Sequence, residues 1–563
     1  MNQPTPAIVT QDAVRRLPRV VLFLFCLAYV VPGFIGREPW KSADITGFGH
    51  MLELARGTSS WFSPTLLGRP PEFDALLPYW LGAWAIQLAP AWVPPDLAAR
   101  VPFIALLALT LAATWYGVYY LARSPQAQPV QFAFGGEARP TDYARAMADG
   151  GLLALVACLG LAQFSHETTP SLAQLAFTAT SFFGIAALPY RLRSAAIALF
   201  AGMLGLALSG GPSMAVLFGL GGALITLLDP SDDPEAIHTH RALQAGWIVA
   251  ALVVCAALAT RLDLWKWRVD LAASSHEWRA ELRLVLWFAW PAWPLAFWTL
   301  WRWRMQVTSR HVALPLWFVL VSIGTMLMTP TSDRSLLLAL PALATLAAFA
   351  LPTFSRSASA LIDWFTLIFF TICAIAIWVI WLSMQTGIPA KPAQNIARLA
   401  PGFVPSFSII AFGVALAGTI AWLWLVRWRT GRHRQVIWKS LVLPASGAAL
   451  CWLLLMTLGL PVLDYARSYS PLVASVRKFV NSPGCVGELG LSRAQIAAFQ
   501  YHGGMELRPA VLAPTCPWLL VAAPEQLEAH ESLDMKDWHL VATVRRPSDR
   551  DENVLVYRKA GSR

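Results

Sequence analysis

The chain has 563 residues, of which 56% are hydrophobic and 13% are charged, and it carries a formal net charge of +11. A composition this apolar excludes a water-soluble globular protein and is typical of a polytopic membrane protein. The Lys and Arg residues stand in short clusters between apolar runs, which is how a membrane protein sets its orientation, so we expect no nucleic-acid partner.

The first apolar run covers residues 20–35 and follows three basic residues, Arg15, Arg16 and Arg19. No small-residue cleavage site follows the run, so we interpret it as a retained span rather than as a signal peptide. The side of a membrane protein that carries more Lys and Arg is the cytoplasmic side, and the N-terminus is therefore predicted to be cytoplasmic.

A dense charged cluster directly follows this span. Its sequence is Gly-Arg-Glu-Pro-Trp-Lys-Ser-Ala-Asp, residues 36–44. Charged groups beside a bilayer are costly unless they are solvated or paired, so the cluster is a candidate reaction site. Charged flanks are also common at helix ends, and anchoring at the membrane boundary explains this stretch equally well when it is taken by itself.

The cluster opens a long outer loop, residues 37–100, which contains Pro-rich turns and two short apolar pieces around 47–55 and 76–88. These pieces are short for spans and are interrupted by polar residues, so we predict helices that lie in the interface plane. Later spans are predicted at 101–122, 151–163, 245–259 and 441–460, with others between them. The total is about thirteen spans, and an odd number places the C-terminal tail outside.

The tail, residues 461–563, is predicted to be a small α/β domain outside the cytoplasm, and residues 1–460 form the transmembrane domain. The tail has one helix-like segment, 493–501, and strand-like segments at 485–491, 518–522, 539–544 and 554–557. Cys485 and Cys516 are the two cysteines of this polar segment, and the other five lie in apolar runs. In a periplasmic or extracellular domain such a pair is expected to form a disulfide.

Several basic residues break the orientation bias because they fall on the outer side. They occur in the first loop, in the loop 261–283 and in the turn at Asp333-Arg334. A site for a phosphate head group would require such cations, since Arg and Lys pair with phosphate through charge-assisted hydrogen bonds. Anchoring to lipid head groups is the alternative. No Cys/His set has zinc spacing, so no metal site is predicted.

His166 and Glu167 stand at the outer end of the third predicted span. They could supply an acid or a base there, although a solvated helix cap is the more common role of such a pair.

The segment 36–44, Phe48-Gly49 and Leu77-Pro78-Tyr79-Trp80, in a chain with a long first outer loop and an outer α/β tail, resemble bacterial aminoarabinose transferases. These are lipid A glycosyltransferases of the protein-mannosyltransferase-like group in the C-type glycosyltransferase superfamily. The resemblance implies a mainly α, polytopic fold of about 13 transmembrane helices with a small C-terminal α/β periplasmic domain. It also implies a polyprenyl-phosphate sugar donor and a site on the outer face of the bacterial inner membrane.

Site residues follow from the same resemblance. The family's principal catalytic acid lies in the first loop, where its Asp-Glu pair falls at Ala43-Asp44, so Asp44 is the expected catalytic residue. The family's Glu-Lys-Pro-Pro becomes Phe73-Asp74-Ala75-Leu76, in which the phosphate-facing Lys is absent and Asp74 stands near its place. A further family Asp falls at Ser171, with Glu167 one helical turn earlier as a substitute.

The implied reaction is an inverting transfer of a sugar from an undecaprenyl-phosphate-linked donor to lipid A, another glycolipid or another acceptor at the periplasmic face. Asp44 would act as the base or would orient the acceptor. Cations would balance the charge on the departing phosphate, and the candidates are Arg37, Lys41, Arg69, Arg268 and Arg334. Further candidates for acceptor binding or acid/base work are Asp74, His166 and Glu167.

Two other functions stay open. A catalytically divergent relative that acts as a binding or assembly partner agrees with the missing Lys. A transporter for a lipid-linked sugar would require charges near mid-span, whereas the charges here cluster at span ends. No cofactor is implied and a divalent metal is left open. We expect a monomer whose partners are the sugar donor, a lipid or glycan acceptor and membrane lipids.

Overall fold

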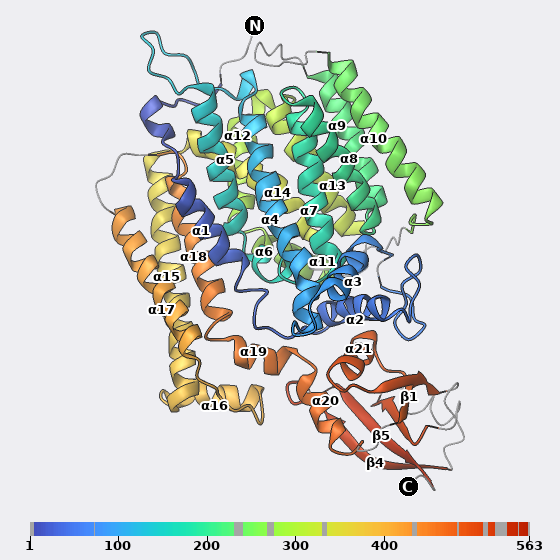
Figure 1. The fold of residues 1–563 in the computed structure, drawn as a ribbon. Coiled ribbons are helices and arrows are strands. Elements are labelled where there is room, and N and C mark those ends of the chain that lie inside the picture. The colour runs from blue at the N-terminus through green and yellow to red at the C-terminus, as the bar shows by residue number, and fades with distance from the viewer. Residues whose placement is uncertain are drawn as a thin grey trace.

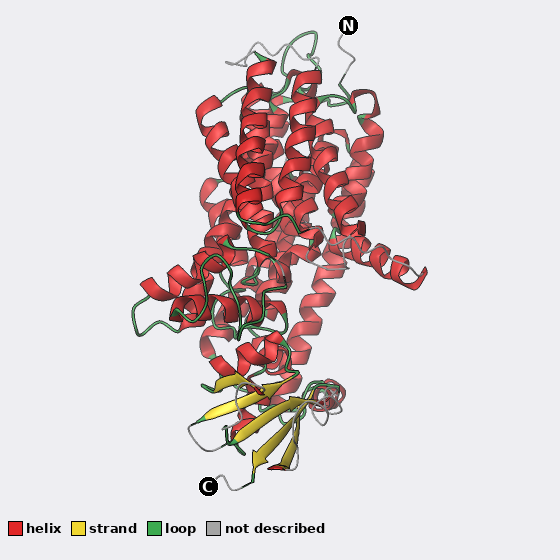
Figure 2. Ribbon diagram, turned by 90° about the vertical axis from the view of Figure 1, so that its right-hand side faces the viewer, coloured by secondary structure: helices red, strands yellow, loops and turns green. Residues whose placement is uncertain are grey.

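The computed structural model of the protein describes residues 5–72, 74–229, 240–266, 275–328, 335–430, 436–480, 484–510, 516–523, 537–549 and 551–560. A tall bundle of helices makes up most of the molecule, and a small sheet lies beyond one end of it (Figure 1). The N-terminus lies at the end of the bundle that is farthest from the sheet (Figure 2).

The bundle is helical because a helix satisfies its own backbone N–H and C=O groups, which lipid cannot do. Its helices are α1 (Arg19–Val30), α4 (Pro95–Ala122), α5 (Pro140–Ala157), α6 (Leu159–Phe164), α7 (Pro170–Ala187), α8 (Leu192–Leu208), α9 (Pro212–Leu228), α10 (Arg241–Arg261), α11 (Ser275–Phe288), α12 (Ala292–Arg302), α13 (Arg310–Met328), α14 (Leu340–Ala350), α15 (Arg356–Thr386), α17 (Ile409–Thr430) and α18 (Lys439–Leu455). A short exposed helix, α16 (Ala390–Leu399), connects α15 to α17.

Six helices of the described residues are long and apolar enough to cross a membrane, and eight spans result if each of two bent helix pairs is one span. The bent pairs are α11 with α12, at 86°, and α18 with α19 (Leu460–Arg467), at 70°. The helices α1, α8 and α9 are apolar but shorter. The chain is therefore a mainly helical, multi-pass membrane protein, and the total of about thirteen spans stays a prediction.

The helices of the first loop lie between the bundle and the sheet (Figure 1). They are α2 (Ala43–Arg56) and α3 (Leu77–Leu88), so helices are confirmed at both predicted places. The helix α2 begins four residues earlier than predicted, at the end of the charged cluster, and it packs against α3 and α21 (Arg493–Tyr501). The helix α4 begins at Pro95 instead of residue 101, because proline suits the first turn of a helix, and it therefore includes Arg100.

The C-terminal part has the short helices α20 (Ser470–Arg477) and α21 and a five-stranded sheet. The strands are β1 (Cys485–Leu489), β2 (Glu506–Pro509), β3 (Trp518–Ala522), β4 (Trp538–Arg545) and β5 (Asn553–Lys559). Their order in the sheet is β2-β1-β3-β5-β4; β1 is parallel to β2 and β3, and β5 is antiparallel to β3 and β4. The predicted helix and four predicted strands are confirmed, and β2 was missed.

The disulfide is present between Cys485, the first residue of β1, and Cys516, two residues before β3. The two cysteines are 31 residues apart in the chain.

Loss of a cross-link over a loop of this length costs about 3–4 kcal/mol in the chain-entropy account. We expect the double variant Cys485→Ser/Cys516→Ser to become sensitive to limited proteolysis in the C-terminal part at a lower temperature. Cys26→Ser, which removes a free thiol on α1, is the control; equal sensitivity of the two variants would contradict the prediction.

Candidate functional site

Asp44 lies in the first turn of α2 and is 1% exposed. Its Oδ1 accepts hydrogen bonds from the backbone N–H and from the hydroxyl of Thr168, both at 2.7 Å. Its Oδ2 accepts from Arg37 Nη2 at 2.7 Å and from the backbone N–H of Trp40 at 3.1 Å. The four acceptor positions of an ionised carboxylate are therefore in use. Of the two states that the sequence left open for these charges, solvated or paired, Asp44 is in the paired one, and the turn at Thr168 covers it.

The protonation of Asp44 follows from these neighbours. Burial alone would raise the pKa of Asp44, because it disfavours the charged form. The charges of Arg37 and Arg100 and the two hydrogen bonds from Thr168 outweigh burial, and the pKa of Asp44 lies below its ordinary value. Asp44 is therefore an anion at neutral pH.

Arg37 is the buried cation beside Asp44, and its side chain is fully buried. Its Nη2 also donates to the carbonyl oxygen of His166 at 2.8 Å, and its guanidinium lies over the ring of Trp40, 4.5 Å from the ring centroid. Its Nε and Nη1 have no hydrogen-bond partner among the described residues. These N–H groups are available to an anion.

Arg100, on α4, is a second buried cation and is not among the residues predicted from the sequence. It is 2% exposed, and its Nη1 forms an ion pair with Asp96 Oδ2 at 3.2 Å. Its Nη2 has no hydrogen-bond partner in the described part of the chain. Arg100 interacts electrostatically with Arg37, Asp44 and Asp464, so the four groups belong to one charged site.

Asp464, on α19, is the second carboxylate of this site and was also missed. Its Oδ1 accepts a hydrogen bond from Trp40 Nε1 at 2.6 Å, and its Oδ2 accepts from the backbone N–H of Glu38 at 3.4 Å. Burial, supported by the charge of Glu38, raises the pKa of Asp464 to about 7. Trp40 thus connects the two carboxylates, through its backbone N–H to Asp44 and through its indole N–H to Asp464.

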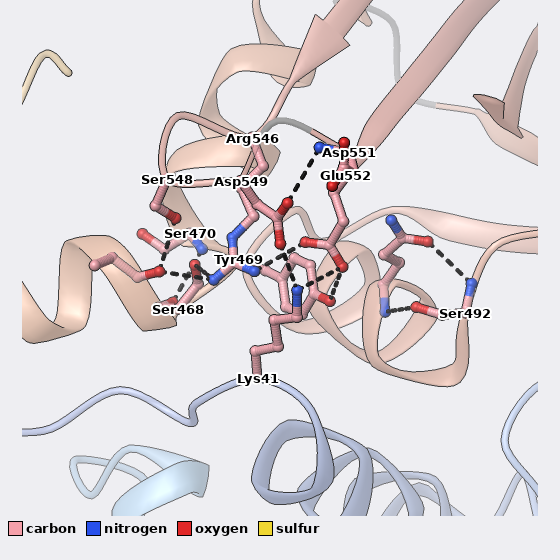
Figure 3. Close-up of polar contacts among 12 residues, drawn as sticks. Lys41, Ser468, Tyr469, Ser470, Ser492, Arg546, Ser548, Asp549, Asp551 and Glu552 are labelled. Atoms are coloured by element: carbon pink, nitrogen blue, oxygen red, sulfur yellow. Dashed lines mark hydrogen bonds and ion pairs between the residues drawn. The ribbon is translucent and has the colours of Figure 1, made fainter. Parts of the chain in front are cut away.

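Lys41 joins the first loop to the C-terminal part (Figure 3). Its Nζ lies 2.9 Å from Asp549 Oδ2 and 3.1 Å from Glu552 Oε1. Glu552 also accepts hydrogen bonds from the hydroxyl of Tyr469 at 2.9 Å and from Arg546 Nη1 at 2.8 Å. These two ion pairs engage Lys41 with the C-terminal part, and the phosphate role that the sequence suggested for Lys41 stays a prediction.

The other predicted residues of the first loop also have partners elsewhere. Arg69 Nη2 pairs with Glu488 of β1 at 2.9 Å, and Arg69 Nη1 donates to the carbonyl oxygen of Leu491 at 2.5 Å. Asp74 accepts a hydrogen bond from Lys266 Nζ at 3.1 Å. The structure therefore does not bring Arg69 or Asp74 to Asp44. The predicted cations Arg268 and Arg334 lie outside the described residues.

His166 and Glu167 belong to the buried turn that covers Asp44. The Nδ1 and Nε2 atoms of His166 lie against the carbonyl oxygens of Ala162 and Tyr29, and a neutral ring donates a hydrogen bond to one of the two. The ring packs among three aromatic rings, those of Tyr29, Phe34 and Trp452. Burial lowers the pKa of His166 to about 3, so the ring is neutral at pH 7. This packing favours a structural role for His166 over the predicted acid/base role. Glu167 Oε1 accepts a hydrogen bond from Gln163 at 3.5 Å.

No group of three or more His, Cys, Asp or Glu side chains is placed to hold a metal ion within the described ranges. The site is thus composed of two carboxylates and two guanidiniums, contributed by the first loop with α2, by α4 and by α19. It is a charged site on a multi-pass membrane protein, at the end of the bundle that faces the sheet (Figure 1).

Comparison with solved structures identifies the fold. The chain is similar to ArnT, an aminoarabinose transferase, from Cupriavidus metallidurans, in a crystal structure bound to undecaprenyl phosphate and in one of the apo state. The TM-scores are 0.65 and 0.58, with 14% sequence identity in both; 97% of this chain is covered each time, and 100% and 99% of the ArnT chains. No protein-family model and no curated protein sequence matches. The predicted resemblance is thereby confirmed for the fold.

Proposed function

We propose that the protein is a membrane-embedded glycosyltransferase that moves a sugar from a polyprenyl-phosphate-linked donor to a lipid or glycan acceptor. The observation that carries the proposal is the likeness to ArnT, a transferase crystallised with undecaprenyl phosphate, over nearly the whole of both chains. The two buried guanidiniums with unpaired N–H groups support it, since a phosphate would satisfy them.

The proposed reaction is one in-line displacement that inverts the anomeric carbon. The acceptor oxygen attacks while the bond to the lipid phosphate breaks, and negative charge develops on the departing phosphate. Arg37 and Arg100 are preorganised to receive that charge in a place that excludes water, where such hydrogen bonds are strongest. Asp44 holds Arg37 in position through the ion pair of 2.7 Å.

The finer assignments are part of the same proposal. The sugar is a hexose or a pentose, and the acceptor is lipid A, another glycolipid or a surface glycan. The protein is placed in the bacterial inner membrane as a monomer, with residues 1–460 as the transmembrane domain and a cytoplasmic N-terminus. Residues 461–563 form the periplasmic domain, and the disulfide supports a non-cytoplasmic location for them. Arg268 and Arg334 remain proposed phosphate ligands.

The test is Asp44→Asn in the intact protein. We expect the variant to lose the modification as completely as a deletion does, with turnover reduced about 100-fold or more, because Arg37 loses the charge that holds it. Mass spectrometry of lipid A and surface glycans measures the outcome. Asp142→Asn, which removes an ion pair to the exposed Arg16, is the control. Normal modification in Asp44→Asn cells, together with its loss in the deletion, would exclude the assignment of Asp44.

A second candidate function is that of a binding or assembly partner without turnover. The observation that favours it is the full occupation of Asp44, whose four hydrogen bonds are typical of a structural ion pair. Such a protein would bind undecaprenyl phosphate, but a deletion would leave the chemical composition of lipid A and glycans unchanged. The same mass spectrometry therefore separates the two functions.

A further inference from the structure

Trp40 connects two carboxylates that differ in what they can still accept. Asp44 is 1% exposed and accepts four hydrogen bonds. Asp464 is half-buried and accepts two hydrogen bonds from the described residues, one of them long, at 3.4 Å. A carboxylate has about four acceptor positions. Asp464 therefore retains positions for the proton of a bound hydroxyl group, and Asp44 does not.

The cations of the site indicate what binds beside Asp464. Arg37 Nε and Nη1 and Arg100 Nη2 are buried and unpaired within the described part of the molecule. A buried donor without a partner costs free energy, so these groups indicate an anionic ligand. The Arg37 guanidinium lies 4.5 Å from the centroid of the Trp40 ring, and Trp40 Nε1 donates to Asp464 Oδ1 at 2.6 Å, so the anion and the carboxylate belong to one site.

We propose that Asp464 is the general base of the glycosyl transfer, that Asp44 is a positioning residue for Arg37, and that the acceptor is an alcohol. The proposal rests on the proposed function and deepens it. The acceptor oxygen forms its bond to the anomeric carbon as the bond from that carbon to the phosphate oxygen breaks. The hydroxyl proton passes to the Asp464 carboxylate, and the electron pair leaves with the polyprenyl phosphate, whose charge Arg37 and Arg100 receive.

An alcohol acceptor follows from the need for a base. A phosphate acceptor is already an anion at pH 7 and has no proton to lose in the transfer, so it needs no base. A hydroxyl group must lose its proton as the new bond forms, and a carboxylate with open acceptor positions serves that step. Asp464 therefore favours a sugar or lipid hydroxyl as the acceptor.

The surroundings of Asp464 suit a base at neutral pH. Burial and the charge of Glu38 raise its pKa to about 7, against the hydrogen bond from Trp40 and the charge of Arg37. The other charged groups that face it are Arg100 on α4 and Arg467 on its own helix, whose guanidinium lies 5.3 Å from the centroid of the Trp40 ring. A base works best with a pKa near the working pH, and neighbouring carboxylates whose pKa values are pushed apart divide the acid/base roles.

The test is the pH dependence of turnover by the full-length protein. The assay follows release of undecaprenyl phosphate from the lipid-linked sugars of the cells in which the protein works. The wild-type rate should rise about tenfold per pH unit below pH 7 and level off above it. Asp464→Asn should reduce the rate about 10²- to 10⁴-fold and abolish this rise. Asp464→Glu, which keeps the carboxylate, should retain the rise at a lower rate.

The affinity for undecaprenyl phosphate shows whether Asp464 acts as a general base or only holds Trp40 in place. The affinity of Asp464→Asn for undecaprenyl phosphate should stay within about threefold of wild type, because Arg37 and Arg100 are unchanged. Asp142→Asn, which removes the ion pair to the exposed Arg16, should keep the wild-type pH profile. An unchanged pH profile in Asp464→Asn, or a loss of affinity as large as the loss of rate, would overturn the assignment of Asp464 alone. A wild-type protein that releases no undecaprenyl phosphate would overturn the proposed function and this inference together.

Discussion

Arg37→Met should destabilise the protein by about 3–5 kcal/mol, because it leaves the Asp44 carboxylate buried without the cation 2.7 Å away. Methionine keeps most of the volume of the side chain, so the effect comes from the charge. The effect should shrink at low pH. The pKa of Asp44 is lowered in the folded protein, so the ion pair stabilises it above about pH 4, and this contribution is lost as the pH falls through the folded pKa.

The matched control for Arg37→Met is Arg16→Met. Arg16 pairs with Asp142 at 2.8 Å, almost the distance of the buried pair, but the Arg16 side chain is 59% exposed. Exposed pairs contribute about 0–1 kcal/mol, so this variant should unfold near the wild-type temperature. The double variant Arg37→Met/Asp44→Asn should recover part of the lost stability. Thermal unfolding in detergent at pH 7 and at about pH 3, below the ordinary pKa of Asp, measures all four proteins. Equal effects of Arg37→Met and Arg16→Met at pH 7 would refute the argument.

The elements that were predictable from the sequence are those whose pattern is local. The helix α21 is an example: Ser492 and Gln495 form a capping box at its start, and it has the bounds that the sequence indicated. The strand β3 is a continuous apolar run and was found with equal precision. The strand β2 was missed because Glu506–Pro509 is short and carries charges, and its conformation depends on pairing with β1.

The site residues also fall into two groups, those that a local sequence pattern indicates and those that only the packing of distant segments brings together. Arg37 and Asp44 stand in one charged segment, and both could be named as site residues from that segment and its resemblance, although their pairing could not. Arg100 and Asp464 come from α4 and α19, and only the packing of these helices against the first loop brings them together. Arg100 had a weak signal, as a basic residue directly before an apolar run on the outer side. Asp464 had no sequence signal, because an acidic residue just after a span is common. Only its hydrogen bond with Trp40, which the sequence does not show, marks it as a site residue.

Lys41 shows a limit of inference from a charged cluster. It lies within the same nine-residue segment as Arg37, and a phosphate role seemed equally good for both. In the structure Arg37 forms an ion pair with Asp44. Lys41 forms ion pairs with Asp549 and Glu552 of the C-terminal part. The C-terminal part therefore fixes the first loop, and it contributes to the site by holding the segment that carries Arg37 and Trp40.

Gly47→Ala should abolish most of the activity without changing any charged group. A Cβ atom at Gly47 would lie 2.5 Å from the carbonyl oxygen of Thr168, which is backbone and cannot rotate away. The turn at Thr168 must then move off α2, and both hydrogen bonds from Thr168 to Asp44 lengthen. A misplacement of about 1 Å can reduce turnover about 100-fold, and the overpacking should cost about 1–3 kcal/mol of stability.

Gly246→Ala on α10 is the matched control, since a Cβ atom there meets nothing within 4 Å. Alanine is the better helix former, so this variant should be as stable as wild type or up to about 1 kcal/mol more stable, with unchanged turnover. Release of undecaprenyl phosphate and thermal unfolding, measured on both variants, decide the matter. If Gly47→Ala turned over at the wild-type rate, the close packing of α2 on Thr168 would have no part in holding Asp44, and the positioning role of that carboxylate would lose its structural basis.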